Sequence, residues 1–399
     1  MRKLILVLFL TCVVSLLAVQ VFIPTARNSA PKANEKAKKN VTVPQAKKVN
    51  APDSAKVINP GLFSLKQEFG GGLGIKSVQV SPNGELAVAC DLEGCSFWII
   101  DLKGGQIREK ITFDRTVVKG YNDNSKQVEG CIAEKPVDCA IDSSGRFAYV
   151  SLYNGDAVVK YSLLENETRA DEPSKKFWVT KEQGGKKTRM QLPAAATGHM
   201  PKMVSMIPGT NRLMTTNWVS GSITVVDCDK MIPVKNVTIG SGAHMYPRGI
   251  AIDREKKWAY VNNMGGGTVT VFDLATLSIV KSIPITSNPG HIQLAKDNKS
   301  FFVCDNRNKL FSQYSTESGK LMRQVGTEFN ALLFSTDKNQ DYAVVLHWYN
   351  SAATIIDLKS FKAVRQFKIR MPIGISFTKN QCLITTYGGG DGRVSVFEW

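Results

Sequence analysis

A pattern of four β-rich runs that recurs along the chain limits the fold more than any other feature. It is clearest in residues 247–287, where three β-rich runs are separated by a charged turn and by the turn Gly265-Gly266-Gly267, and a fourth run follows. A single antiparallel meander of this kind cannot bury both of its faces. We therefore expect it to pack against neighbours like itself.

The third run of this unit, TVTVFD, has counterparts along most of the chain. A run of the AYVNN type precedes each one, and from Asp227 onward the spacing is 40 to 46 residues. This period is typical of a four-stranded propeller blade. The counterparts end at Asp101, Ser162, Asp227, Ser315, Asp357 and Glu398. The sequence thus predicts an all-β fold, a seven-bladed β-propeller.

The two ends of this predicted propeller complement each other. The chain stops at Trp399, just after a third run, so the last blade lacks its outer strand. A strand-like run without a blade, residues 62–69, precedes the first blade. Pairing this run beside residues 393–399 would close the ring and remove exposed sheet edges. We expect closure by this pairing.

The N-terminus carries an apolar segment. Residues 4–23 follow a basic start and are long enough to span a bilayer as a helix. We expect an uncleaved anchor in the inner membrane, with the rest of the chain periplasmic or at the cell surface, and a cleaved signal followed by secretion as the alternative. The expected organisation is an anchor or signal over 1–23, a disordered basic linker over 24–57 and the propeller over 58–399.

The net charge indicates the kind of partner that the protein can bind, and the cysteines indicate possible disulfides. The formal net charge is +17, of which residues 1–57 carry +8, so the propeller itself is basic and anionic partners are favoured. Cys90 and Cys95 flank a turn and form a possible disulfide in an oxidising compartment, as do Cys131 and Cys139. Because no CxxC occurs and the four histidines are scattered, we expect no metal site.

Candidate ligand-binding residues lie in the loops that lead into the first strand of each blade and in those that join the second and third strands. Both sets of loops should share one loop-rich face at the channel mouth, and they interleave aromatic with basic side chains. That composition is typical of surfaces that stack bases or sugars and neutralise phosphates or carboxylates, although a single loop Trp or His is more often packing. The candidates are His199, Lys202, Trp218, His244, Arg248, His291, Arg307, His347, Trp348 and Tyr349.

Two insertions, residues 112–134 and 163–199, interrupt the period. We expect both to lie over the loop-rich face, either as a lid or partner surface or as tolerated surface insertions. No Gly-x-Ser-x-Gly, HExxH or paired-carboxylate motif occurs, so no catalytic residue is predicted.

The run WAYVNNMGGGTVTVFDLATLSIVKSIPI (258–285), preceded by PRGIAID, resembles the YVTN-type repeat of bacterial YncE-like propellers. The resemblance implies an exported, cofactor-free propeller. Some relatives are similar to DNA-binding propellers, and others to propeller subunits of quinohaemoprotein dehydrogenases or to lactonase-type enzymes. The anchor, the basic linker and the insertions of this chain depart from that family.

Together these features predict a monomeric, membrane-tethered binding scaffold outside the cytoplasm that recognises a protein or an anionic polymer through its loop-rich face. The alternatives are a propeller that binds single-stranded DNA or RNA, and a lactonase- or dehydrogenase-like enzyme or enzyme subunit.

Overall fold

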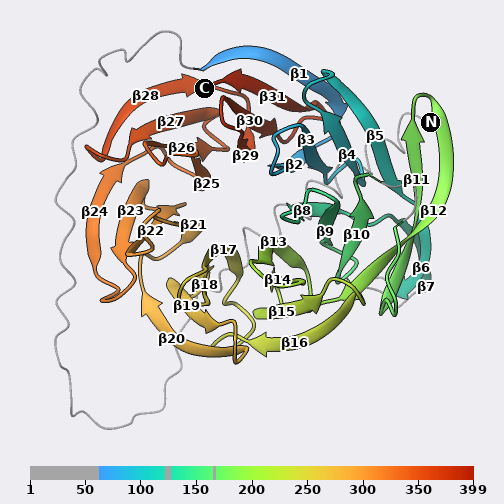
Figure 1. Ribbon diagram of the computed structural model, residues 1–399, viewed down its shortest axis with the longest axis horizontal. Coiled ribbons are helices and arrows are strands. Elements are labelled where there is room, and N and C mark those ends of the chain that lie inside the picture. The colour runs from blue at the N-terminus through green and yellow to red at the C-terminus, as the bar shows by residue number, and fades with distance from the viewer. Residues whose placement is uncertain (1–62, 122–126, 165–167) are drawn as a thin grey trace. The chain divides into compact units, whose positions relative to one another are not determined.

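The computed structural model describes residues 63–121, 127–164 and 168–399. Within these ranges the chain forms 31 strands and no helix, and the sheets are arranged in a ring, as in a β-propeller (Figure 1). No helix in this part of the chain is long and apolar enough to cross a membrane. The predicted anchor (1–23) and linker (24–57) lie outside the described residues.

Four sheets are four-stranded antiparallel meanders whose strands follow in chain order from the ring centre outward. They correspond to four of the predicted repeats, those whose third runs end at Asp227, Asp273, Ser315 and Asp357. The first contains β13 (Pro201–Ile207), β14 (Arg212–Asn217), β15 (Ser222–Asp227) and β16 (Ile232–Thr238); the second β17 (Pro247–Asp253), β18 (Trp258–Asn263), β19 (Thr268–Asp273) and β20 (Ser278–Pro284). The third contains β21 (Pro289–Leu294), β22 (Ser300–Asp305), β23 (Leu310–Ser315) and β24 (Leu321–Gly326); the fourth β25 (Ala331–Thr336), β26 (Tyr342–His347), β27 (Ala352–Asp357) and β28 (Lys362–Lys368).

The fifth four-stranded sheet closes the ring with both ends of the propeller. It consists of β29 (Pro372–Phe377), β30 (Gln381–Thr386), β31 (Gly392–Glu398) and, outermost, β1 (Ser64–Gly72). Strands β1 and β31 run antiparallel, with Ser64 opposite Glu398 and Phe69 opposite Val394. The predicted closure by residues 62–69 is confirmed.

The remaining part of the ring is one nine-stranded sheet. Its order is β2 (Ile75–Val80), β3 (Leu86–Asp91), β4 (Ser96–Asp101), β5 (Gln106–Phe113), β11 (Lys175–Gln183), β12 (Lys186–Ala196), β10 (Ala157–Ser162), β9 (Phe147–Leu152) and β8 (Pro136–Ile141). It contains two four-stranded units, β2 to β5 and β8, β9, β10 with β12. Strand β11 pairs with β5 on one side and with β12 on the other, and so joins the two units.

The two insertions therefore do not lie where we expected them. Residues 163–199 supply the hairpin β11–β12, which pairs with β5 and β10 instead of covering the channel. Residues 112–134 supply a separate two-stranded sheet, β6 (Thr116–Tyr121) and β7 (Gln127–Ile132), at the outer edge of the ring in Figure 1. Unpaired outer strands gain hydrogen-bond partners from such a hairpin, which explains its position.

The second and third strands of each repeat are almost wholly buried, since they are packed between neighbouring sheets; β18 and β19 are examples. The aspartates that end third strands cap the following turns. The Asp273 carboxylate accepts hydrogen bonds from the backbone N–H groups of Ala275 and Thr276, both at 2.8 Å. This agrees with a structural role for the recurring aspartate.

The predicted bridge between Cys90 and Cys95 is wrong, because both thiols are free. Cys90 is fully buried in the core between sheets, whereas Cys95 occupies a tight turn with a positive φ of 48°. Cys139 is also a free, buried thiol, and the side chain of Cys131 lies outside the described part of the chain.

Candidate functional site

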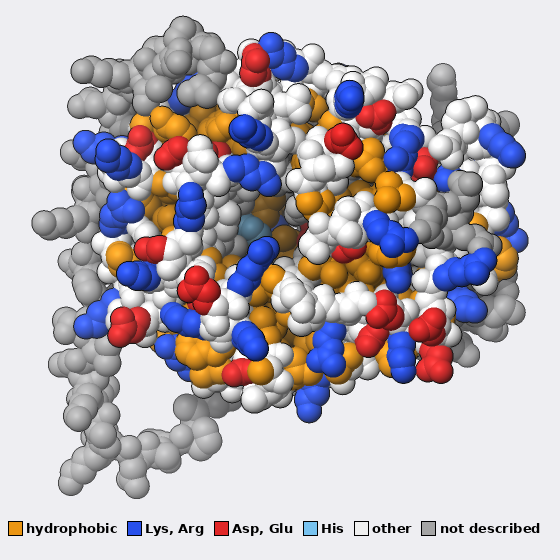
Figure 2. Space-filling view, viewed as in Figure 1, with side chains coloured by type: hydrophobic (Ala, Val, Ile, Leu, Met, Phe, Trp, Pro, Cys, Tyr) orange, Lys and Arg blue, Asp and Glu red, His pale blue; other side chains and the backbone are white. Residues whose placement is uncertain are grey.

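The innermost strands of the ring surround a central cavity of about 760 Å³. Every innermost strand contributes to its wall: β2, β8, β13, β17, β21, β25 and β29. Figure 2 shows a hollow at the centre of the ring with Lys and Arg side chains around it. A cavity of this size is typical of a site for a small ligand or for a short segment of a larger one.

The cavity runs along the innermost strands. At the beginnings of these strands it is lined by Lys76, Asp138, Lys202, Arg248 and His291. At the other end it is lined by side chains from the turns that follow the strands, among them Arg254, Lys296 and Lys338. Because these turns lie at the surface, the cavity opens on the face opposite the loop-rich face.

The loop-rich end of the cavity is closed by a set of apolar and aromatic side chains, which we call the aromatic plug. Buried and partly buried side chains from four of the six sheets that form the ring meet there in one cluster. The plug consists of Leu92, Val137, Tyr153, Met264, Leu332, Trp348, Ile373 and Tyr387. The loop-rich face was expected to form the channel mouth, and this expectation is wrong, since its aromatic side chains pack together across the axis.

Two lysines lie beneath the plug with their ammonium groups against its rings. Lys76 Nζ is 5.0 Å from the centre of the Tyr387 ring and 5.6 Å from that of Trp348. Lys202 Nζ is 4.7 Å from the Tyr153 ring and 4.9 Å from the Trp218 ring. Aromatic faces stabilise cations but carry no net charge. Neither lysine forms an ion pair with any described residue.

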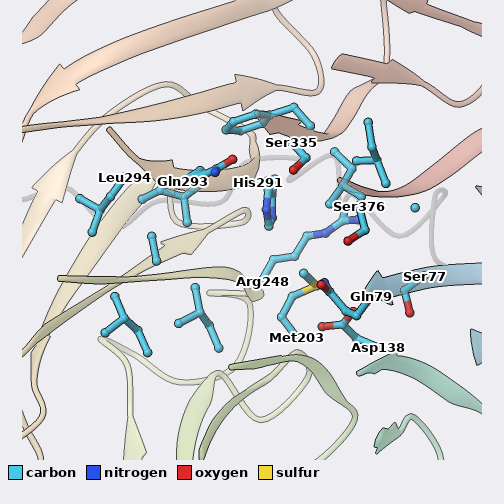
Figure 3. A pocket seen from close by; sticks show the side chains of 18 of the residues that line it. Ser77, Gln79, Asp138, Met203, Arg248, His291, Gln293, Leu294, Ser335 and Ser376 are labelled. Carbon is cyan, nitrogen blue, oxygen red and sulfur yellow. The ribbon is translucent and has the colours of Figure 1, made fainter. Parts of the chain in front are cut away.

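Arg248 extends across the cavity between His291 and Asp138 (Figure 3). It is only 6% exposed, and its Nε is buried without a hydrogen-bond partner in the described structure. Burial lowers the pKa of Arg248 to about 10, so the guanidinium stays protonated at neutral pH. A buried cation without a paired anion is unfavourable, and a bound anion would relieve this cost.

Asp138 is the one acidic side chain among the described residues of the cavity wall. Burial raises its pKa to about 7, and its Oδ2 accepts a hydrogen bond from the Val204 N–H at 3.0 Å. Burial, and then the charge of Arg248, lower the pKa of Lys202 to about 7. Burial likewise lowers the pKa of Lys76 well below its usual value, with further contributions from Lys202 and Arg248. The basic groups repel one another, and one half-ionised carboxyl does not balance them.

His291 completes the inner end of the cavity. Burial, followed by the nearby charge of Arg248, lowers its pKa to about 3, so the imidazole is neutral at physiological pH. Its Nδ1 is buried without a partner within the described residues, and its ring lies 5.4 Å from that of Phe334, centre to centre. It is therefore positioned to exchange a hydrogen bond with a ligand bound at Arg248.

Of the predicted site residues, only Lys202, Arg248 and His291 line the cavity. Trp218 lies above Lys202, where it packs on Tyr246. The others lie on the loop-rich face or inside a sheet. His199 is exposed, with Nδ1 3.0 Å from Asp156 Oδ1; His244 is exposed near the Tyr246 hydroxyl; Arg307 is exposed in the turn after β22; and Trp348 stacks on Tyr349 with ring centres 4.4 Å apart.

The expectation that all four histidines share one surface is wrong. His347 is 0% exposed, and its Nε2 lies 2.9 Å from Thr354 Oγ1 on the neighbouring strand β27. The equivalent last residues of β14 and β18 are Asn217 and Asn263, which donate hydrogen bonds to Ser and Thr hydroxyls of their own third strands. His347 thus occupies a structural position of the repeat.

Sequence reasoning missed Lys76 and Asp138. A signal for Lys76 is present, because the second residue of every innermost strand lies at the same level of the ring. These residues are Lys76, Val137, Lys202, Arg248, Gly290, Leu332 and Ile373. A comparison of this one position across repeats would have separated the three cations from the apolar residues of the plug.

Comparison with known proteins adds information about the fold alone. No family model and no curated protein matches the chain. Among solved structures, a chain of hydrazine synthase from Kuenenia stuttgartiensis is similar, with a TM-score of 0.61 and 14% sequence identity over 88% of this chain and 99% of that one. The described residues contain no group of three or more His, Cys, Asp or Glu side chains arranged to hold a metal ion.

Proposed function

We propose that the protein is a non-enzymatic β-propeller scaffold that binds an anionic group in its central cavity. The observation that carries the proposal is the buried, unpaired guanidinium of Arg248, accompanied by Lys76 and Lys202. A carboxylate, phosphate or sulfate bound there would accept two parallel hydrogen bonds from the guanidinium. It would also favour the protonated forms of both lysines.

We further propose that the ring has seven blades, with the nine-stranded sheet counted as two. Strands β2 to β5 follow the order of a complete repeat, and β8, β9, β10 and β12 follow it as well. In this description β11 is an additional strand that joins two neighbouring blades along their outer edges.

The cavity changes the location that we propose for recognition. A protein or anionic polymer would present its anionic group to the open end of the cavity, not to the loop-rich face. The aromatic rings proposed to stack on single-stranded nucleic acid are engaged with each other and with lysines, as the pairs Trp218–Tyr246 and Trp348–Tyr349 show. Membrane attachment outside the cytoplasm stays a prediction that rests on residues 4–23.

Calorimetric titration of the full-length chain with sulfate and with acetate tests the proposal. We expect saturable binding that Arg248→Gln weakens by about 30-fold or more, because a hydrogen bond to a charged group contributes roughly 2 kcal/mol or more. Arg307→Gln, which changes an exposed arginine outside the cavity, is the matched control. Equal binding by the Arg248 variant and the wild type would refute the proposal.

A further inference from the structure

We infer that the natural ligand is an elongated dianion with an uncharged middle. One anionic end would bind at Arg248, and the other at three basic side chains around the opening of the cavity, which we call the rim cations: Arg254, Lys296 and Lys338. The inference rests on the proposed function, since it presupposes an anion at Arg248.

The rim cations come from equivalent turns of three consecutive sheets. They follow β17, β21 and β25, and within the described residues none of them forms an ion pair. All three line the cavity. Charges from three neighbouring sheets that face one opening reinforce one another and attract an anion.

Two acidic side chains of the same turns, Asp253 and Asp337, are already bound to the backbone; Asp297 also accepts a backbone N–H, Glu255 is exposed, and neither of these last two lines the cavity. The Asp253 Oδ1 accepts the N–H groups of Glu255 and Lys256 at 3.0 and 3.1 Å, and the Asp337 Oδ1 accepts that of Tyr342 at 2.8 Å. Both aspartates are buried and neither lines the cavity. They act as turn caps and leave the rim cations available to a ligand.

Between the two basic ends, the cavity wall carries no charged side chain among the residues described. Ile250, Ile292 and Ile375 supply apolar wall there. The polar side chains at this level are largely bound within the fold: Gln293 Nε2 donates to Thr336 Oγ1 at 2.8 Å, and Ser376 Oγ accepts the Val80 N–H at 3.3 Å. A ligand body at this level would therefore be uncharged and mainly apolar.

The length of the cavity sets the separation of the two anionic groups. Arg248 and Arg254 belong to the same strand and its turn, and at about 3.3 Å per residue their Cα atoms are at most roughly 20 Å apart. Because long side chains reach toward the ligand, charges about 10 to 20 Å apart would match both ends. This corresponds to a long α,ω-dicarboxylate, or to a peptide tail of roughly three to five residues with a terminal carboxylate and an acidic side chain upstream.

Calorimetric titration with two matched series tests this inference on the full-length chain. One series contains α,ω-dicarboxylates from succinate to hexadecanedioate, and the other contains monocarboxylates of the same lengths. We expect each long dicarboxylate to bind about tenfold more tightly than its matched monocarboxylate, and succinate to show no such advantage, because the second anion must reach the rim cations.

A charge reversal at the rim separates the two ends. Lys296→Glu should abolish the advantage of each long dicarboxylate over its matched monocarboxylate, while sulfate binding should fall far less than in Arg248→Gln. Lys299→Glu, an exposed lysine that does not line the cavity, should change neither. An advantage that survives Lys296→Glu together with Lys338→Glu would overturn the inference.

The remaining outcomes distinguish the inference from the proposed function and identify the source of the ligand. Tight binding of sulfate without any length dependence among dicarboxylates would overturn the elongated dianion and leave the anion site intact. Absence of all anion binding would refute the proposed function itself. If an acidic peptide competes better than every dicarboxylate, and C-terminal amidation removes this advantage, the ligand is the tail of a protein. If a dicarboxylate competes better than the peptide, the ligand is a free diacid. Either order supports the inference.

Discussion

The two ends of the central cavity differ, and the open end is not the loop-rich one that was predicted from the sequence. The end that carries the aromatic loops is closed, because those side chains pack together into the plug. The end that carries short turns is open and basic. The richness of a loop in aromatic side chains therefore does not show where a ligand binds. It shows where apolar side chains can reach one another.

The largest expected effect tests the closed end. Leu332→Ala should lower the free energy of unfolding by about 2 to 4 kcal/mol, because Leu332 is buried in the plug and the substitution leaves a cavity. Lys338→Ala, in the turn at the end of the same strand, should change it by less than about 0.5 kcal/mol. Denaturant unfolding measures both. Similar values for the two variants would contradict a packed end opposite an open one.

The next effect tests the strain that the unpaired charge places on the cavity. Without added anion, Arg248→Met should raise the free energy of unfolding by about 1 to 3 kcal/mol, since an apolar side chain replaces a buried cation without a partner. Unfolding in a buffer of low anion content measures this. A loss of stability of similar size would mean that the guanidinium has a structural partner.

A third effect concerns pH. When the pH falls through 7, Lys202 gains a proton and Asp138 loses its negative charge, because both have pKa values of about 7. Both changes favour an anion, so sulfate should bind about tenfold more tightly at about pH 6 than at about pH 8. Calorimetry at the two pH values measures this ratio. In the double variant Lys202→Arg, Asp138→Asn this ratio should fall, leaving only a contribution from Lys76, and an unchanged ratio would exclude Lys202 and Asp138 as its source.

The smallest effect tests whether the loop-rich face takes part. His199 is exposed on a loop of the loop-rich face, and its Nδ1 lies 3.0 Å from Asp156 Oδ1. His199→Ala should change stability by less than about 0.5 kcal/mol and sulfate affinity by less than about twofold. Thermal unfolding and calorimetry measure the two quantities. A large fall in sulfate affinity would indicate that the ligand binds at the loop-rich face, as was predicted from the sequence.

Much of the fold could be predicted because it depends on local patterns. Alternating β-rich runs with glycine and aspartate turns define the strands, and the surplus run at 62–69 predicted the closure seen between β1 and β31. The hairpin β11–β12 was not predicted as a bridge. Its position depends on which outer strands lack partners, and that is a property of neighbouring sheets.

The candidate site shows the same division between sequence and structure. Arg248, Lys202 and His291 were found because they lie in loops that lead into innermost strands, but Lys76 and Asp138 were missed, and His347 was wrongly placed at the surface.

By itself the sequence determined the recurring strands, the strand pair that closes the ring and the basic character of the protein, since each follows from the pattern of each run, from the number of runs or from composition. Only the tertiary structure decided which end of the cavity is closed and which cations face one another without an acid. Those outcomes depend on which side chains of separate sheets come together at the axis of the ring. The order of neighbouring residues in the chain does not determine this.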